Sequence, residues 1–193
     1  MQPEIKVTET FSDLAAISRA LRALTEQDVF IGIPEDESGR ESTGGITNAH
    51  LGYIHEFGVP EKNIPARPHL LPGIEDIQRD AIDLLEDAAR EAMNGNEKAV
   101  ATNLNKIGVL GQNAVRARFV NNEWPPLADR TLDYKPLKKN DEGEVITDKK
   151  GNPKRKKSRR EKERVNPLID TGQLRKAYTY VVRKKGNTAL VVK

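Results

Sequence analysis

Two helical apolar patterns follow each other between residues 74 and 118, and they constrain the fold more than any other feature. Apolar residues recur there every three or four positions, which predicts a long helix from about residue 74 and a second one over roughly residues 97–118. The Asn94-Gly95-Asn96 sequence between them predicts a break. The two apolar faces comprise Ile74, Ile77, Ala81, Leu84, Leu85, Ala88 and Ala92, and then Val100, Leu104, Ile107, Leu110, Ala114 and Val115. Gly108 and Gly111 cost helix stability unless another element packs closely against them.

Shorter patterns flank these two helices. Residues 11–24 predict a helix with Thr10 as its N-cap, and residues 29–33 predict a short strand. Near the end of the chain, residues 178–183 and 189–192 predict two strands joined by a hairpin turn. The predicted first helix carries its apolar stripe on Phe11, Leu14, Ile17, Leu21 and Leu24. We therefore expect one α+β domain over residues 1–193, with a small, mainly antiparallel sheet packed with long helices.

Two segments before the long helices are harder to assign. Residues 49–58 fit a helix and a strand equally well. Prolines at positions 60, 65, 68 and 72 predict a connector without regular structure as far as Gly73. No internal repeat is evident.

Composition narrows the class of protein. The chain has no cysteine, which excludes disulfides and thiolate metal sites. Its beginning lacks an apolar stretch, and no run approaches the ~18 apolar residues of a membrane span, so we expect neither a signal peptide nor a membrane segment.

Charge is concentrated in one segment. Residues 149–164 contain ten lysines and arginines against two glutamates, whereas the net charge of the chain is only +3. The surrounding insertion, residues 138–164, has only Val145 and Ile146 as aliphatic residues, so we expect an extended basic loop, or a hairpin with a turn near Lys150-Gly151-Asn152. Three interpretations stay open: a solvated loop, contact with DNA phosphates, or an arm that grips an acidic patch on a neighbouring subunit. The residues expected to make such contacts are Lys149, Lys150, Lys154, Arg155, Lys156, Lys157, Arg159 and Arg160.

Catalytic and metal-binding motifs fail on their own geometry. A zinc-protease helix needs a second histidine four residues after His55, but that position is Val59 and Pro60 follows it. No Walker A loop, G-x-G-x-x-G loop or G-x-S-x-G elbow occurs. We therefore expect no enzyme activity, no cofactor and no metal.

An acidic stripe accompanies the first long helix. Its members, at helical spacing, are Asp76, Asp80, Asp83, Asp87 and Glu91. Such a stripe predicts a solvated face or a docking surface for a neighbouring subunit, and Arg79 and Arg90 partly compensate its charge.

Two sets of short motifs resemble a known family. The first contains Tyr53-Ile54-His55-Glu56-Phe57-Gly58 and then Ile64-Pro65-Ala66-Arg67-Pro68-His69-Leu70. The second contains Trp124-Pro125-Pro126-Leu127 and, after the insertion, Pro167-Leu168-Ile169-Asp170-Thr171-Gly172-Gln173-Leu174-Arg175. Together, in this order, they resemble the tail-component or tail-completion proteins of siphophages and the related Mu-like virion morphogenesis proteins. His69 departs from that family, which usually has phenylalanine there, and the family pattern does not cover the basic insertion.

The resemblance implies a structural protein of the virion, assembled in the host cytoplasm, that completes or joins the tail as a ring around the DNA channel. Its expected partners are further copies of itself, the head connector, and the tail terminator or tube proteins; double-stranded DNA in the channel is a further candidate.

The motif residues also have structural interpretations, and we expect His55, Glu56 and Gly172 to be anchors of the fold. Arg67 is suited to a carboxylate or to carbonyls at a helix end. Asp170 or Thr171 is the expected N-cap of a short helix, and Trp124 is expected in the core beneath the two long helices.

Overall fold

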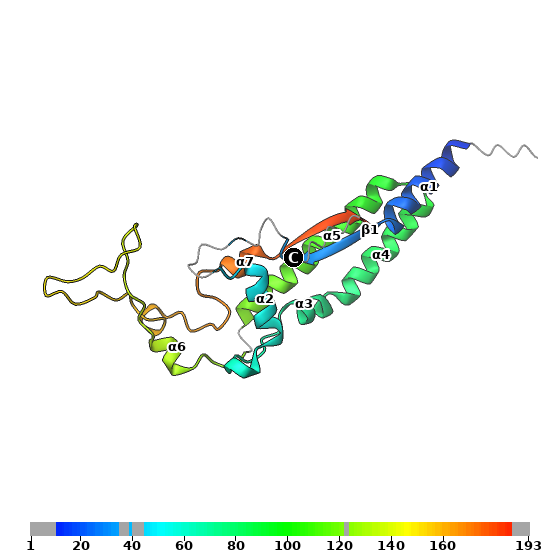
Figure 1. The fold of residues 1–193 in the computed structure, drawn as a ribbon. Helices are drawn as coiled ribbons and strands as arrows, with labels where there is room; N and C mark the ends of the chain where they lie inside the picture. The colour runs from blue at the N-terminus through cyan, green and yellow to red at the C-terminus, as the bar shows by residue number, and fades with distance from the viewer. Residues whose placement is uncertain (1–10, 35–38, 40–44, 122–123, 187–193) are drawn as a thin grey trace, which may run out of the picture.

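Helix α5 (Glu97–Asn121) runs along most of the body of the molecule, and helices and strands pack on it from several sides (Figure 1). The structure, a computed structural model, describes residues 11–34, 39, 45–121 and 124–186. The other helices are α1 (Phe11–Thr25), α2 (Asn48–Phe57), α3 (Leu70–Asp76), α4 (Gln78–Met93), α6 (Asp129–Asp133) and α7 (Gln173–Ala177), with 3₁₀ turns η2 (Pro60–Lys62) and η3 (Arg160–Lys162).

Strands β1 (Gln27–Gly32) and β2 (Thr179–Lys184) form a two-stranded antiparallel sheet, with Val29 opposite Val182 and Ile31 opposite Tyr180. These residues alternate along the strands, so one face of the sheet packs on α5. The α+β prediction, with helices packed on a small antiparallel sheet, is confirmed. The strand predicted over residues 189–192 lies outside the described residues.

The core consists of two clusters along α5. The first lies between α1, α4, α5 and the sheet and contains Ala20, Ala23, Ala92, Val100 and Leu104. The second lies towards the C-terminal end of α5 and contains Val115, Phe119, Leu168, Leu174 and Tyr178. The second cluster is the one that brings together segments far apart in the sequence.

The predicted apolar faces of α1 and α4 are partly wrong. In α1, Leu14 is 58% exposed and Leu21 is 36% exposed, whereas Ala20 and Ala23 are buried. Small alanines let α1 approach its neighbours closely, and the larger leucines then fall at the margin of the contact. In α4, Leu85 is 44% exposed, because the buried side of the helix follows Ala88 and Ala92.

The proline-rich connector is more regular than predicted. Pro60 begins η2, and Pro72 is the third residue of α3, where its missing N–H costs no helical hydrogen bond. The ambiguous segment over residues 49–58 is helix α2, capped by Thr47, whose hydroxyl accepts a hydrogen bond from the His50 backbone N–H at 3.1 Å.

The single long helix predicted from residue 74 is instead two helices, α3 and α4, which meet at Ile77. Two contacts fix α3 to α5. A Cβ atom at Gly73 would lie 2.8 Å from the Val115 Cα atom, and Arg118 donates to the Asp76 carboxylate. The chain therefore bends at Ile77 so that both α3 and α4 stay on α5.

Close packing explains the two glycines inside α5. A Cβ atom at Gly108 would overlap the ring of Tyr180, and one at Gly111 would overlap the end of the Ile31 side chain. The expectation that another element packs closely there is confirmed, and that element is the sheet.

We predict that Gly108→Ala destabilises the protein. Overpacking costs about 1–3 kcal/mol, and the gain of about 1 kcal/mol from replacing a helical glycine offsets only part of it. Chemical denaturation followed by circular dichroism measures the difference. Gly32→Ala is the matched control, since a Cβ there meets nothing within 4 Å. A Gly108→Ala variant as stable as the parent would contradict this account of the contact.

Candidate functional site

Glu56 joins the first motif into one unit by capping α3. Its carboxylate accepts backbone hydrogen bonds from His69 at 2.8 Å, Leu70 at 2.9 Å and Leu71 at 3.0 Å. These N–H groups have no partner inside the helix, and a carboxylate there also meets the positive end of the helix dipole. His55 contributes through its backbone, because its carbonyl oxygen accepts from the Arg67 N–H at 2.6 Å. Both residues therefore connect α2 to the start of α3.

His69 connects the first motif to the chain beyond the second. Its side chain is fully buried, with Nδ1 2.9 Å from the Arg67 carbonyl oxygen and Nε2 2.6 Å from the Tyr178 hydroxyl. Burial lowers the pKa of the imidazole, although the Arg67 carbonyl and the Glu56 carboxylate oppose that shift. Burial also raises the pKa of the Tyr178 phenol. The buried His69 ring makes two polar contacts that a phenylalanine, the residue expected here from the resemblance, could not make.

Arg67 and Trp124 have buried polar atoms without a partner. Arg67 is 5% exposed, yet its Nε atom has no hydrogen-bond acceptor among the described residues. The expected contact with a carboxylate or helix-end carbonyls is thus not formed by the Arg67 side chain within that part of the chain. Trp124 packs against the second core cluster, and its Nε1 atom also lacks a described partner. That cluster contains Val115 and Phe119 of α5, and Ile74 of α3, the first residue of the predicted first long helix, packs against it as Trp124 does, whereas no residue of α4 takes part.

The N-cap predicted at Asp170 or Thr171 is displaced by one residue. Gly172 caps α7 with φ +77°, a conformation that glycine adopts without strain. The Thr171 hydroxyl accepts from the Gln173 N–H at 3.4 Å, and the Asp170 carboxylate instead faces the guanidinium groups of Arg159 at 3.5 Å and Arg164 at 3.8 Å.

Residues 136–157, which we call the arm, form a closed triangle of three short extended segments. Three backbone hydrogen bonds close the triangle. The Lys138 N–H donates to the Lys154 carbonyl oxygen at 2.8 Å, the Lys154 N–H to the Ile146 carbonyl oxygen at 2.8 Å, and the Ile146 N–H to the Lys138 carbonyl oxygen at 3.0 Å. Each pair of segments is also joined by one antiparallel β-bridge. The three bridges are Lys139 to Val145, Thr147 to Pro153 and Leu137 to Arg155. The expected hairpin is therefore only one side of a three-sided structure.

An eight-residue repeat builds the arm and was missed in the sequence. Asn140 and Gly143 form one turn, and Asp148 and Gly151 form the next, with φ +86° and +82° at the glycines. In each turn the leading side chain accepts a backbone hydrogen bond, from the N–H of Glu144 or from those of Lys150 and Asn152. The spacing of Asn/Asp-x-x-Gly is the signal that could have revealed it.

An ion-pair network, which we call the anchor, holds the base of the arm. Arg160 contacts the Asp129 carboxylate at 2.6 Å and the Asp133 carboxylate at 2.7 Å, and Lys135 contacts Glu161 at 2.7 Å. These contacts tie η3 to α6. The Lys135 ammonium and the Ser158 N–H lower the pKa of the Glu161 carboxyl to about 2, so the pair stays ionised in mildly acidic solution.

The predicted basic contact residues divide into two groups. Arg155, Arg159 and Arg160 are used within the chain: Arg155 donates to the Lys135 carbonyl, Arg159 to those of Arg164, Asn166 and Ile169, and Arg160 to the anchor. The five lysines are exposed, and their ammonium groups make no hydrogen bond or ion pair with the described residues; these are Lys149, Lys150, Lys154, Lys156 and Lys157. Only these five remain available for the predicted contact.

The acidic stripe on α4 is largely solvent-facing, with partial compensation. Asp80, Asp83 and Asp87 are exposed, and Arg90 contacts Asp87 at 3.0 Å, as the i, i+3 spacing predicted. Asp76 belongs to α3 and pairs with Arg118. The stripe is therefore shorter than predicted.

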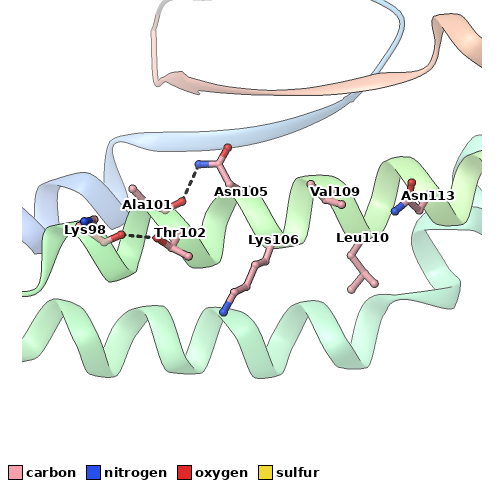
Figure 2. Close-up of a pocket in the computed structure, with 8 residues that line it drawn as sticks. All are labelled: Lys98, Ala101, Thr102, Asn105, Lys106, Val109, Leu110 and Asn113. Atoms are coloured by element: carbon pink, nitrogen blue, oxygen red, sulfur yellow. Dashed lines mark hydrogen bonds between the residues drawn. The ribbon is translucent and has the colours of Figure 1, made fainter.

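A shallow groove on α5 lacks the groups for acid–base chemistry. Figure 2 shows Lys106 and Leu110 pointing towards α4 and Asn105 towards the sheet. Thr102 donates to the Lys98 carbonyl and Asn105 to the Ala101 carbonyl, so the helix itself already satisfies these polar side chains. The groove contains no carboxylate or imidazole side chain.

Comparison with protein-family models, with curated proteins and with solved structures found no match for this chain. In the described ranges, no group of three or more histidine, aspartate or glutamate side chains is placed to hold a metal ion. Within the same ranges, no helix has both the length and the apolar character of a membrane span.

We predict that His69 makes stability depend on pH. The pKa of His69 is about 6.5 in the unfolded chain, and burial lowers it in the folded protein. The unfolded state therefore binds more protons in acid. The contribution is present above that pH and is lost as the pH falls below it. His69→Phe should flatten the profile between about pH 5 and 7, whatever its absolute stability. Denaturant titrations across this range measure it, with the exposed His50→Gln as control; an unchanged slope in His69→Phe would contradict the assignment.

We also predict that Arg160→Gln loosens the arm without unfolding the body. Loss of the contacts to Asp129 and Asp133 lets the base of the arm open more often, so proteolysis after Lys149 and Lys150 should be severalfold faster. Mass spectrometry of limited tryptic digests measures it. Arg130→Gln, a change at an exposed arginine of α6, is the control, and equal digestion rates in both variants would argue against the anchor.

Proposed function

We propose that the protein is a structural subunit at the head–tail junction of a tailed bacteriophage, where copies form a ring around the DNA channel and complete or join the tail. The proposal rests on the ordered motifs that resemble siphophage tail-completion proteins. It assigns the protein no catalytic role.

One structural observation supports it. Leu70 of the first motif set packs against the core cluster that contains Leu168 and Leu174 of the second, although these residues lie about a hundred positions apart in the sequence. Motifs that belong to one family should form one unit, and here they do so through packing, capping and turns. Two polar motif side chains also have structural roles: Glu56 caps a helix and Asp170 pairs with arginines.

The shape of the molecule is also suited to assembly. The arm and α6 extend away from the helical body, at the opposite end from α1 (Figure 1). Large apolar side chains remain exposed on the body, among them Tyr53 at 66%, Phe57 at 64% and Leu71 at 62%. Exposed apolar side chains and a projecting arm are features that contacts between subunits use.

A phage that lacks the protein tests the proposal. We expect negative-stain images of lysates to contain filled heads and complete tails that are not joined, with joining restored when the protein is supplied. Normally joined virions would overturn the head–tail role. Heads without DNA would place the protein at an earlier step and would also overturn it.

A nucleic-acid-binding module is the second candidate, favoured by the five unpaired lysines of the arm. Leu137 and Arg155 face each other across a bridge, so residues 138–154 can be replaced by two glycines without separating the ends. Lys156→Gln/Lys157→Gln in the same variant removes the other two of the five lysines. Tight, salt-sensitive binding of duplex DNA by the monomer, abolished in this deletion variant, would favour this candidate over the assembly role. Weak binding that the deletion leaves unchanged would count against it.

A further inference from the structure

The arm has no hydrophobic core. Of its aliphatic side chains, Val145 and Ile146 are 40% and 37% exposed and Leu137, at the base, is half-buried, and no arm residue belongs to either core cluster. Small β-structures without a buried face are only marginally stable by themselves. Backbone hydrogen bonds and the anchor thus hold the arm in shape while most of its charged side chains remain exposed.

The charges of the arm are separated between its corners. The first turn, residues 140–144, carries Asp141, Glu142 and Glu144 and no cation. The second turn, residues 148–152, exposes Lys149 and Lys150. Its single carboxylate, Asp148, accepts hydrogen bonds from the N–H groups of Lys150 at 2.8 Å and Asn152 at 3.0 Å, which lower its pKa. The third corner, residues 154–157, consists of lysines and an arginine only.

The two signs of charge are kept apart by the fold of the arm. The closed triangle of hydrogen bonds through Lys138, Ile146 and Lys154 places the acidic and basic turns on different corners. Because the hydrogen-bonded triangle fixes the two turns at separate corners, the acidic turn cannot fold onto the basic turn of its own arm. A second molecule of unlike charge can therefore bind each turn, although Lys138 and Lys139 also flank the acidic turn.

A second copy of this chain fits that requirement better than DNA does. Duplex DNA presents one sign of charge, so it would attract the lysines and repel the three carboxylates at the neighbouring corner. Another arm presents both signs. A contact between unlike patches on identical chains is heterologous, and repetition of such a contact generates a ring or a filament.

We infer that the arm is a self-docking module, in which the acidic turn of one copy, residues 140–144, binds the basic corners of the next copy, residues 148–152 and 154–157. The inference deepens the proposed function, since it names how copies in a ring contact each other. It concerns the isolated protein, however, and can therefore fail or hold separately from a role in the virion.

Charge reversal tests the inference. Variant A, Asp141→Lys/Glu142→Lys, has mainly basic corners, and variant B, Lys149→Glu/Lys150→Glu/Lys156→Glu/Lys157→Glu, has mainly acidic ones. We expect the parent protein to self-associate at low salt in sedimentation velocity, and less so at high salt. Each variant alone should associate at least about tenfold more weakly. An equimolar mixture of A and B should regain association, because each supplies the charge that the other lacks.

A matched control isolates the arm from net charge. Glu26→Lys/Glu61→Lys changes the total charge as variant A does, but at exposed positions outside both the arm and the acidic stripe of α4, and should associate like the parent. Circular dichroism confirms that each variant is folded.

Three outcomes would overturn the inference: a parent protein that is monomeric at low salt, variants that associate as the parent does, or a mixture that does not regain association. Tighter binding of duplex DNA by variant A together with unchanged self-association would assign the arm to nucleic acid instead.

Discussion

The contact between α5 and the sheet at Gly108 and Gly111 is the constraint on which the body of the molecule depends. Tyr180 and Ile31 lie where the side chains of these two positions would otherwise be. The absence of two Cβ atoms lets the strands sit directly on the helix backbone. Since Tyr178 immediately precedes β2, the same contact places its hydroxyl beside His69. The sheet therefore determines where the second core cluster forms.

The second cluster explains why the ordered motifs belong together. Glu56 fixes the start of α3, the proline-containing connector leads from α2 to it, and His69 connects both to the chain that follows α7. These are interactions that build a rigid surface. Their organisation accords with the proposed role in assembly, in which recognition depends on shape and on exposed side chains rather than on a reactive group.

The arm is held together by different physics. The body buries alanine, valine, leucine and aromatic side chains, whereas the arm relies on a cycle of backbone hydrogen bonds and on ion pairs at its base. Such a structure needs few apolar residues and leaves its charged side chains exposed to solvent. The acidic and basic turns then follow directly from the two copies of the eight-residue repeat, because equivalent positions, such as Asp141 and Lys149, carry opposite charge.

The sequence by itself determined helices around residues 11–24 and 97–118, helical structure without its break over residues 74–92, the two strands that pair, and the α+β class, because periodic apolar residues and breakers act locally. It also indicated that Gly108 and Gly111 needed a close neighbour. Only the tertiary structure decided which neighbour that was, why the chain bends at Ile77, and that alanines rather than leucines face the core in α1. It also decided that Arg160 belongs to the anchor and that Arg159 faces Asp170, while five lysines stay exposed. The sequence lists these charges, but only the fold brings Asp129, Asp133 and Asp170 within reach of the arginines. Local patterns determine elements, and long-range contacts determine which side chains remain available to a partner.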